Sequence, residues 1–191
     1  MRIWENRYNR DVQRLNLALR MIAHKARTNM ICEWTGLPYE RVRKLCRTYA
    51  PTHSNGGKDR NRGPSPHLIG RFLGSARGRL EAAALVSVCL ALDVVPAKPV
   101  ANARREVPGV VRGERLCKAF EMYSTLVPDS TVTIEQVALL VLAVAEGVEV
   151  GVGHCDTCRA VILHDPYGIG QWHCTHCSAD IIEERKKATA S

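Results

Sequence analysis

The stretch that decides the interpretation of this sequence contains two cysteine pairs, Cys155-Asp-Thr-Cys158 and Cys174-Thr-His-Cys177, separated by fifteen residues. A gap of two residues lets both sulfurs of one tight turn reach the same metal ion, and a loop of this length lets a second turn complete a tetrahedron. Zinc suits four thiolates because it is soft enough for sulfur and has no redox chemistry. The spacing therefore predicts one structural Zn²⁺ per chain, held by Cys155, Cys158, Cys174 and Cys177.

The residues between the two pairs predict a zinc ribbon over residues 154–180. Ala160–Leu163 and Gln171–His173 have the composition of short strands. Asp165-Pro-Tyr-Gly168 carries Pro and Gly where a hairpin turns. The predicted order is knuckle, strand, turn, strand and knuckle.

Other uses of the cysteines are weighed against this site. Two disulfides require an oxidising compartment, and a redox dithiol requires only one Cys-x-x-Cys beside a βαβ pattern, which the sequence lacks. A catalytic zinc keeps an open position and commonly has His ligands. Three nearby histidines are candidates to replace a sulfur: His154, His173 and His176. Four cysteines in register favour the structural site.

Composition describes a basic protein with an aliphatic core. The 191 residues carry a formal charge of +8, with 46% hydrophobic but only 5% aromatic residues, which suits helices better than a β-sandwich. The charge favours a polyanionic partner, nucleic acid before membrane. The N-terminus has no secretory signal, and the longest apolar run, Val137–Ala145, is too short to span a bilayer. We therefore expect a cytoplasmic protein with no membrane partner.

The rest of the chain predicts a mostly α fold. Apolar residues at three- and four-residue spacing indicate one helical face over residues 9–27. Segments that are apolar on most sides predict buried helices over 80–95 and 136–145, the latter opened by a capping box at Thr133-Ile-Glu-Gln136. Another helix is predicted over 111–127. The domain organisation is then a helical domain (1–153), the ribbon (154–180) and a tail (181–191).

Residues 28–49 have the order of a helix-turn-helix. A short helix over 28–35 is followed by Gly36-Leu37 as a turn and by Pro38, which suits the first position of a second helix ending at Tyr49. An ordinary helical hairpin is the alternative. As a recognition helix, this segment would present five candidate DNA contacts: Tyr39, Arg41, Arg43, Lys44 and Arg47.

Residues 50–79 form a loop by composition, rich in Pro, Gly and Ser. The loop is basic, and a flexible basic arm beside a helix-turn-helix suggests phosphate contacts. The candidates are Lys58, Arg60 and Arg62. A solvated linker is an equal alternative.

The whole arrangement resembles the FlhC family, the larger subunit of the bacterial flagellar master transcriptional regulator. The resemblance rests on Ala26 to Leu45, on the Pro/Gly loop after it, and on Val144-Ala-Glu-Gly147 followed by the two Cys-x-x-Cys pairs. Residues 96–113 and the mixed-sign segment Ile181–Lys187 depart from the family pattern.

The resemblance implies a DNA-binding transcriptional activator subunit that is not an enzyme. Family members bind a small helical partner, FlhD, as a heterohexamer of four FlhD and two FlhC subunits, contact double-stranded promoter DNA and help to recruit RNA polymerase. The controlled genes are flagellar, or transfer genes in relatives on mobile elements. Carried over, the four cysteines at 155, 158, 174 and 177 hold the zinc.

Two other functions compete with this one. The first is a zinc-containing protein-interaction adaptor without direct DNA readout. The second is a metal-dependent nuclease or hydrolase, which would use His154, His164, Asp165 or His173. It requires an open metal position and converging carboxylates, and neither is visible in the sequence.

Overall fold

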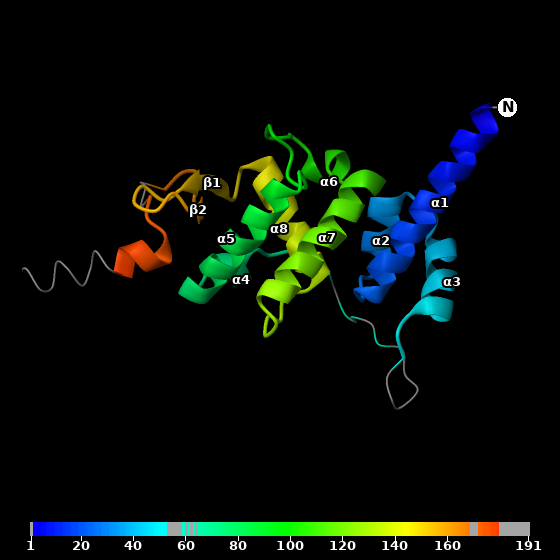
Figure 1. Cartoon of the computed structure of the whole chain (residues 1–191), viewed down its shortest axis with the longest axis horizontal. Helices are drawn as coiled ribbons and strands as arrows, with labels where there is room; N and C mark the ends of the chain where they lie inside the picture. Colours follow the sequence, from blue (N-terminus) through cyan, green and yellow to red (C-terminus); the bar gives the residue numbers. More distant parts are fainter. Residues whose placement is uncertain are drawn as a thin grey trace, which may run out of the picture.

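The computed structural model of this chain describes residues 2–52, 59, 61, 63, 65–168 and 172–179. Helices dominate, and a small two-stranded sheet follows them near the C-terminal end (Figure 1). The predicted mostly α class is confirmed. In chain order the elements are α1 (Arg2–Ala23), α2 (Thr28–Thr35), α3 (Tyr39–Tyr49), α4 (Gly70–Leu73), α5 (Ala76–Ala91), α6 (Ala103–Glu106), α7 (Val110–Leu126), α8 (Ile134–Glu146), β1 (Gly151–His154) and β2 (Val161–His164).

The first three helices pack on one another at one end of the elongated molecule (Figure 1). Leu17 and Met21 of α1 are fully buried, as are Trp34 of α2 and Val42 of α3. The turn between α2 and α3 depends on Gly36, whose φ of 68° lies in the left-handed region that glycine adopts without strain. We call α1, α2 and α3 the trihelical unit.

The middle of the molecule is built on α8, which packs against α5, α6 and α7. Its side chains are buried on nearly every side, as its apolar sequence predicts. The predicted capping box is confirmed: Thr133 accepts a hydrogen bond from the backbone N–H of Gln136, and the Gln136 side chain accepts one from that of Thr133. Gly147 ends the helix in a left-handed conformation.

A glycine on α7 permits its close approach to the trihelical unit. A Cβ atom placed on Gly113 would lie 2.6 Å from Leu17 Cδ2 and 3.4 Å from Trp34 Cε3. Carbon atoms pack favourably at about 3.5–4.0 Å, so a side chain here would displace the buried Leu17 side chain or the helix that carries it. Gly113 thus sets the spacing between α7 and the helices that precede it.

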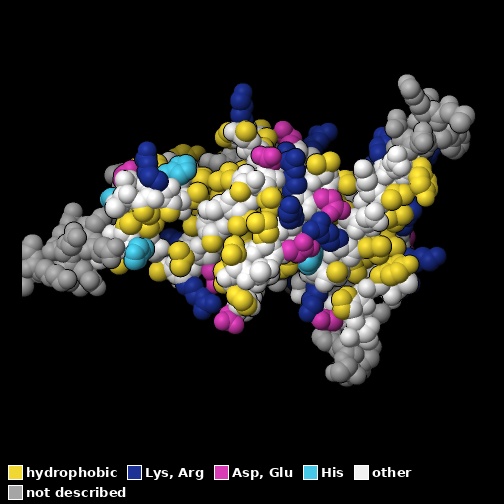
Figure 2. Space-filling view, in the orientation of Figure 1, with side chains coloured by type: hydrophobic (Ala, Val, Ile, Leu, Met, Phe, Trp, Pro, Cys, Tyr) yellow, Lys and Arg dark blue, Asp and Glu magenta, His cyan; other side chains and the backbone are white. Residues whose placement is uncertain are grey.

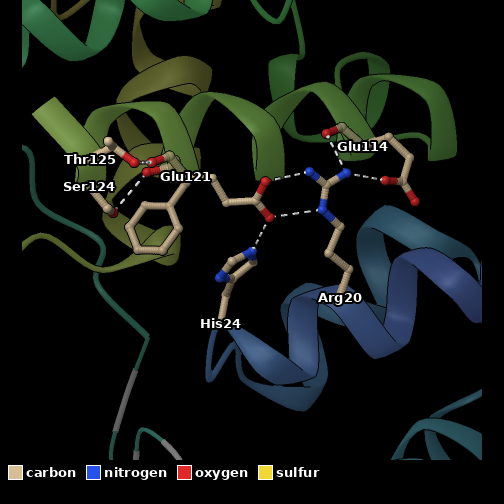
Figure 3. A network of polar contacts seen from close by, with 7 residues as sticks. Arg20, His24, Glu114, Glu121, Ser124 and Thr125 are labelled. Atoms are coloured by element: carbon tan, nitrogen blue, oxygen red, sulfur yellow. Dashed lines mark hydrogen bonds and ion pairs between the residues drawn. The ribbon is translucent and has the colours of Figure 1, made fainter.

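Charged side chains join the same surfaces. Arg20 of α1 lies between two carboxylates of α7, with Nη2 2.6 Å from Glu121 Oε2 and Nη1 2.5 Å from Glu114 Oε2 (Figure 3). His24 Nε2 also lies 2.7 Å from Glu121 Oε1. The hydrogen bond from Arg20 lowers the pKa of Glu121, which stays ionised to lower pH than a free carboxyl.

A second ion pair connects the start of α2 to α8. The Arg27 guanidinium pairs with Glu135, and the Arg27 backbone N–H donates to the same carboxylate at 2.7 Å. Glu135 is buried. A buried carboxylate needs such partners, so this contact fixes the trihelical unit on the helical core.

The predicted loop over residues 50–79 is wrong at its C-terminal end. Residues 70–73 form α4, and α5 begins at Ala76 instead of residue 80. Ser75 explains this start, because its side chain accepts a hydrogen bond from the Gly78 backbone N–H as an N-cap. The helix then ends at Ala91, several residues before Pro96, with Asp93 in a left-handed conformation (φ 51°).

Candidate metal centre

The four cysteines of the two pairs come together in space. Their sulfurs all lie within 4.8 Å of one another, and Cys158 Sγ is 3.7 Å from Cys174 Sγ. A tetrahedral zinc with Zn–S bonds of about 2.3 Å places its sulfurs about 3.8 Å apart, whereas a disulfide requires about 2.05 Å. The eight cysteines are free thiols. The geometry is that of a possible four-thiolate metal site.

The first knuckle is a tight turn closed by backbone hydrogen bonds. The Cys155 N–H donates to the Ala160 carbonyl at 2.8 Å, and the Arg159 N–H donates to the Cys155 carbonyl at 2.9 Å. Arg159 takes a left-handed conformation (φ 61°), which turns the chain back into β2. Cys155 is buried and Cys158 is exposed.

The second knuckle opens a short helical segment over residues 175–179. The Cys177 N–H points at Cys174 Sγ at 3.4 Å, and the Ser178 N–H donates to the Cys174 carbonyl at 2.9 Å. The knuckles are tied together by the Asp156 N–H, which donates to the Trp172 carbonyl at 2.7 Å. Each pair therefore presents its two sulfurs from a hydrogen-bonded turn.

The predicted strand order of the ribbon is wrong in one respect. Residues 160–163 match β2, but its partner is β1, which precedes the first knuckle and pairs antiparallel with it from Gly151↔His164 to His154↔Val161. Of the predicted strand 171–173, residue 171 lies outside the described residues, and Trp172 and His173 are not in a strand. The Trp172 carbonyl bonds to the first knuckle instead. The turn after β2 is confirmed, with Tyr167 N–H donating to Asp165 Oδ1 at 2.9 Å.

Two glycines of β1 make room for aromatic rings against the sheet. A Cβ on Gly151 would lie 2.4 Å from the His164 ring, and one on Gly153 would lie 2.7 Å from the Trp172 ring. The two rings contact each other with centroids 4.7 Å apart. This packing holds Trp172 against the sheet, and with it the chain segment that leads to Cys174.

Hydrogen bonds shift the pKa values of two of the four cysteines in opposite directions. Backbone N–H groups, first that of Cys158, lower the pKa of Cys155 to about 5. The hydrogen bond with the Cys174 sulfur raises the pKa of Cys177 to about 12. Neighbouring thiolates repel one another, so a cation is required for all four to ionise. A bound divalent metal would supply that charge.

The donor set fits a metal held by sulfur alone. Among the described residues, no histidine or carboxylate joins the four cysteines as a further ligand. His173 Nδ1 lies 3.3 Å from the Thr157 hydroxyl, and His164 Nδ1 lies 3.1 Å from the Asp165 carbonyl. His154 and His176 are exposed. In this arrangement the neighbouring histidines and Asp165 do not converge with the sulfurs on one point.

The predicted DNA contacts on α3 are all at the surface. Tyr39, Arg41, Arg43, Lys44 and Arg47 are exposed, while Val42 and Cys46 are buried on the opposite face of the helix. Arg43 Nη1 lies 3.8 Å from Glu40 Oε1. No carboxylate within the described ranges forms an ion pair with the other three basic side chains of α3: Arg41, Lys44 and Arg47.

The structure does not bring the metal site and α3 together. The trihelical unit and the sheet lie at opposite ends of the molecule, with α5, α7 and α8 between them (Figure 1). On the face drawn in Figure 2, basic side chains are spread along the molecule and acidic ones lie among them. The predicted loop contacts Lys58, Arg60 and Arg62 lie outside the described residues.

The sequence interpretation missed the roles of the β1 glycines and of Arg20. The spacing Gly151-x-Gly153, followed by an aromatic residue near the second pair, was the available signal for the first. The contacts of Arg20 with α7 join residues about one hundred positions apart and leave no local pattern.

Within the part of the chain that the structure describes, no helix has the length and apolar character needed to cross a membrane. Comparison of the chain with models of known protein families and with curated proteins finds no match.

Proposed function

We propose that this chain is a DNA-binding transcriptional activator subunit similar to the FlhC family, in which α2 and α3 act as a helix-turn-helix. The observation that carries the proposal is the exposed basic side of α3. Arg41, Lys44 and Arg47 project from one helix with no carboxylate of the described residues paired to them. Such a helix offers hydrogen-bond donors to phosphates and to guanine edges in the major groove.

The surroundings of α3 support this role. The helix is anchored by its opposite face, through Val42 and Cys46, and follows α2 after the short turn at Gly36. A recognition helix needs this combination, because it must lie rigidly in the groove while the preceding helix crosses the DNA backbone. A helix with both faces buried could not make these contacts.

The proposed metal is zinc, and its proposed role is structural. Four thiolates fill a tetrahedron and leave no open coordination position for a substrate or a water molecule. Bound zinc would stabilise both knuckles, and Cys155, Cys158, Cys174 and Cys177 would hold it. A saturated site of this kind supports a binding protein rather than an enzyme.

The proposed partners follow from the resemblance. They are an FlhD-like subunit, in an assembly of four such subunits with two copies of this chain, promoter DNA of flagellar or transfer genes, and RNA polymerase, all in the cytoplasm. Exposed apolar side chains offer surface for a protein partner. They include Leu80 and Leu90 of α5 and Val111 and Leu126 of α7.

The test is selection of bound sequences from a random duplex pool by the metal-loaded chain, alone and co-expressed with an FlhD-like subunit. Enrichment of one sequence that is lost with Arg41→Ala and Arg47→Ala, and kept with Arg105→Ala at an exposed position of α6, would support the proposal. No enrichment in either form would contradict it. Partner binding without enrichment would instead favour the protein-interaction adaptor.

A further inference from the structure

A groove of about 880 Å³ runs beside the contact between α5 and the C-terminal module, by which we mean residues 151–179. One wall is the outer side of α5, with Leu80, Ala83 and Ala84, and the other includes all of β2 and the second knuckle. Leu80 is 61% exposed although it is a large apolar residue. The volume lies within the range of about 300–1,000 Å³ that is typical of ligand sites.

The groove follows one edge of β2. Successive side chains of a strand point to opposite faces of a sheet. Val161 and Leu163 pack toward the main core, whereas Ile162 packs with three of the cysteines. A groove lined by all four residues of the strand must therefore run along its edge. Since β1 occupies one edge, the groove lies along the other.

The register of the hairpin shows which backbone groups point into the groove. Cys155 N–H donates to the Ala160 carbonyl, which makes these opposite residues a hydrogen-bonded pair. Hydrogen-bonded and non-hydrogen-bonded pairs alternate along an antiparallel ladder. Ile162 and His164 therefore direct their N–H and C=O groups to β1. Val161 and Leu163 direct theirs to the groove.

Within the described ranges, the sheet contains β1 and β2 alone, so this edge has no strand beside it. We propose that the groove binds an extended segment of a partner protein, which adds to β2 as a third strand. Strand addition satisfies the outward N–H and C=O groups of β2. A helix would leave them unsatisfied, because its own backbone groups are already bonded internally.

The walls also define the side chains that such a segment would carry. Alternate residues would face α5, where Leu80 and Ala84 require apolar partners. Arg79 lies in the lining of the groove, where its Nη1 donates to the Leu73 carbonyl at 2.9 Å, and the described residues place no carboxylate in ion-pair distance of it. An acidic residue at the corresponding end of the segment would complement this guanidinium. The expected partner is thus an extended segment with alternating apolar residues and an acidic end.

The first measurement uses the full, metal-loaded chain without a partner. Amide hydrogen exchange followed by NMR should show protection at Ile162 and faster exchange at Val161 and Leu163. Equal protection at all three amides would mean that the edge is already covered, and would overturn the proposal.

The second measurement uses a displayed library of random twelve-residue peptides as the probe. Selected peptides should have apolar residues at every second position and should protect the Val161 and Leu163 amides when bound. Val161→Pro removes one N–H that points into the groove and leaves the hydrogen bonds between β2 and β1 in place. The matched control Val161→Ala keeps that N–H. Loss of one such hydrogen bond predicts about tenfold weaker binding for the proline variant than for the alanine variant.

Several outcomes would overturn this assignment. They are equal peptide affinity of the two Val161 variants, peptides with helical three- and four-residue spacing, and a library without binders. If a chain shortened after Ala179 binds peptide much more tightly, the occupant of the groove is the chain's own C-terminal end. If the chain forms concentration-dependent dimers that peptide dissociates, the occupant is a second copy. Loss of protection at the Ile162 amide in Val161→Pro would show that this variant does not fold. The protection of the Val161 and Leu163 amides by peptide bound to the wild type then decides alone.

Discussion

Removal of the metal by a chelator should unfold the C-terminal module and leave the helices intact. The local core of the module is small: Cys155, Ile162 and Cys177 are its buried members. Full burial of one such aliphatic side chain contributes about 1.5–3 kcal/mol, whereas structural zinc contributes about 10 kcal/mol or more of folding free energy. Packing of Val161 and Leu163 against the main core adds to the free energy of burial, but the sum stays below the contribution of the metal. The metal is therefore expected to dominate the stability of this module.

The assay is amide hydrogen exchange before and after stoichiometric chelation at constant pH. Protection at Ile162 should be lost, while protection at Leu140 in α8 should remain. Trp172 fluorescence should shift toward longer wavelength, because its contacts with Gly153 and His164 depend on the module. Far-ultraviolet circular dichroism should change little, since the helical residues of the module, within its described part, are 175–179.

Two cysteine variants separate the metal effect from a general loss of thiols. Cys158→Ser removes one ligand at an exposed position and should lower the metal affinity strongly, while Cys32→Ser, outside the cluster, should not. The reasoning is refuted if Ile162 keeps its protection after the metal has left. It is also refuted if the helices of the core unfold together with the module.

Three further predictions concern the frame that holds α1, α2 and α3 on the core. Gly113→Ala should lower the free energy of unfolding by about 1–3 kcal/mol through overpacking, against little change for Gly70→Ala, whose Cβ would meet no atom within 4 Å; urea titration measures both. Arg27→Met should cost about 3 kcal/mol, because it leaves a buried carboxylate without its cation, and a loss below about 0.5 kcal/mol would contradict this. The lowered pKa of Glu121 stabilises the fold above the carboxyl's unfolded pKa of about 4.3, and this contribution is lost as pH falls through the lower folded value. Glu121→Gln should therefore flatten that part of the stability–pH curve, measured by unfolding between pH 7 and pH 3, and an unchanged curve would show that the Arg20 contact is not stabilising.

Local sequence signals predicted the parts of this fold that depend on local physics. The cysteine spacing predicted the sulfur cluster, and the Thr133 to Gln136 motif predicted the observed cap. Both depend on groups a few residues apart or on a short loop. The start of α5 was missed because residues 70–79, rich in Gly, Ser and Arg, have the composition of a loop, whereas the helix begins after the Ser75 N-cap.

The errors and omissions share a different physical origin, which is contact between distant segments. The partner of β2 could have come from either side of the first knuckle, and β1 is the one selected by the packing of His164 and Trp172 on its glycines. The Arg20 contacts and the groove beside α5 likewise require the assembled fold.

The proposed DNA contact of α3 is tested most directly by salt dependence. The measurement is fluorescence anisotropy of a selected duplex over a salt series, for the wild type, for the triple variant Arg41→Ala/Lys44→Ala/Arg47→Ala, and for the control Lys98→Ala/Arg105→Ala/Lys118→Ala. All six side chains are exposed, so both variants remove three surface charges.

Each lost phosphate contact reduces the slope of log K against log salt by about 0.9. The slope of log K against log salt should therefore be smaller by up to about 2.7 for the α3 variant, which should also bind more weakly. The control variant should keep most of its slope and of its affinity. Equal slopes and affinities for the two variants would contradict the assignment of α3 as the DNA-binding helix.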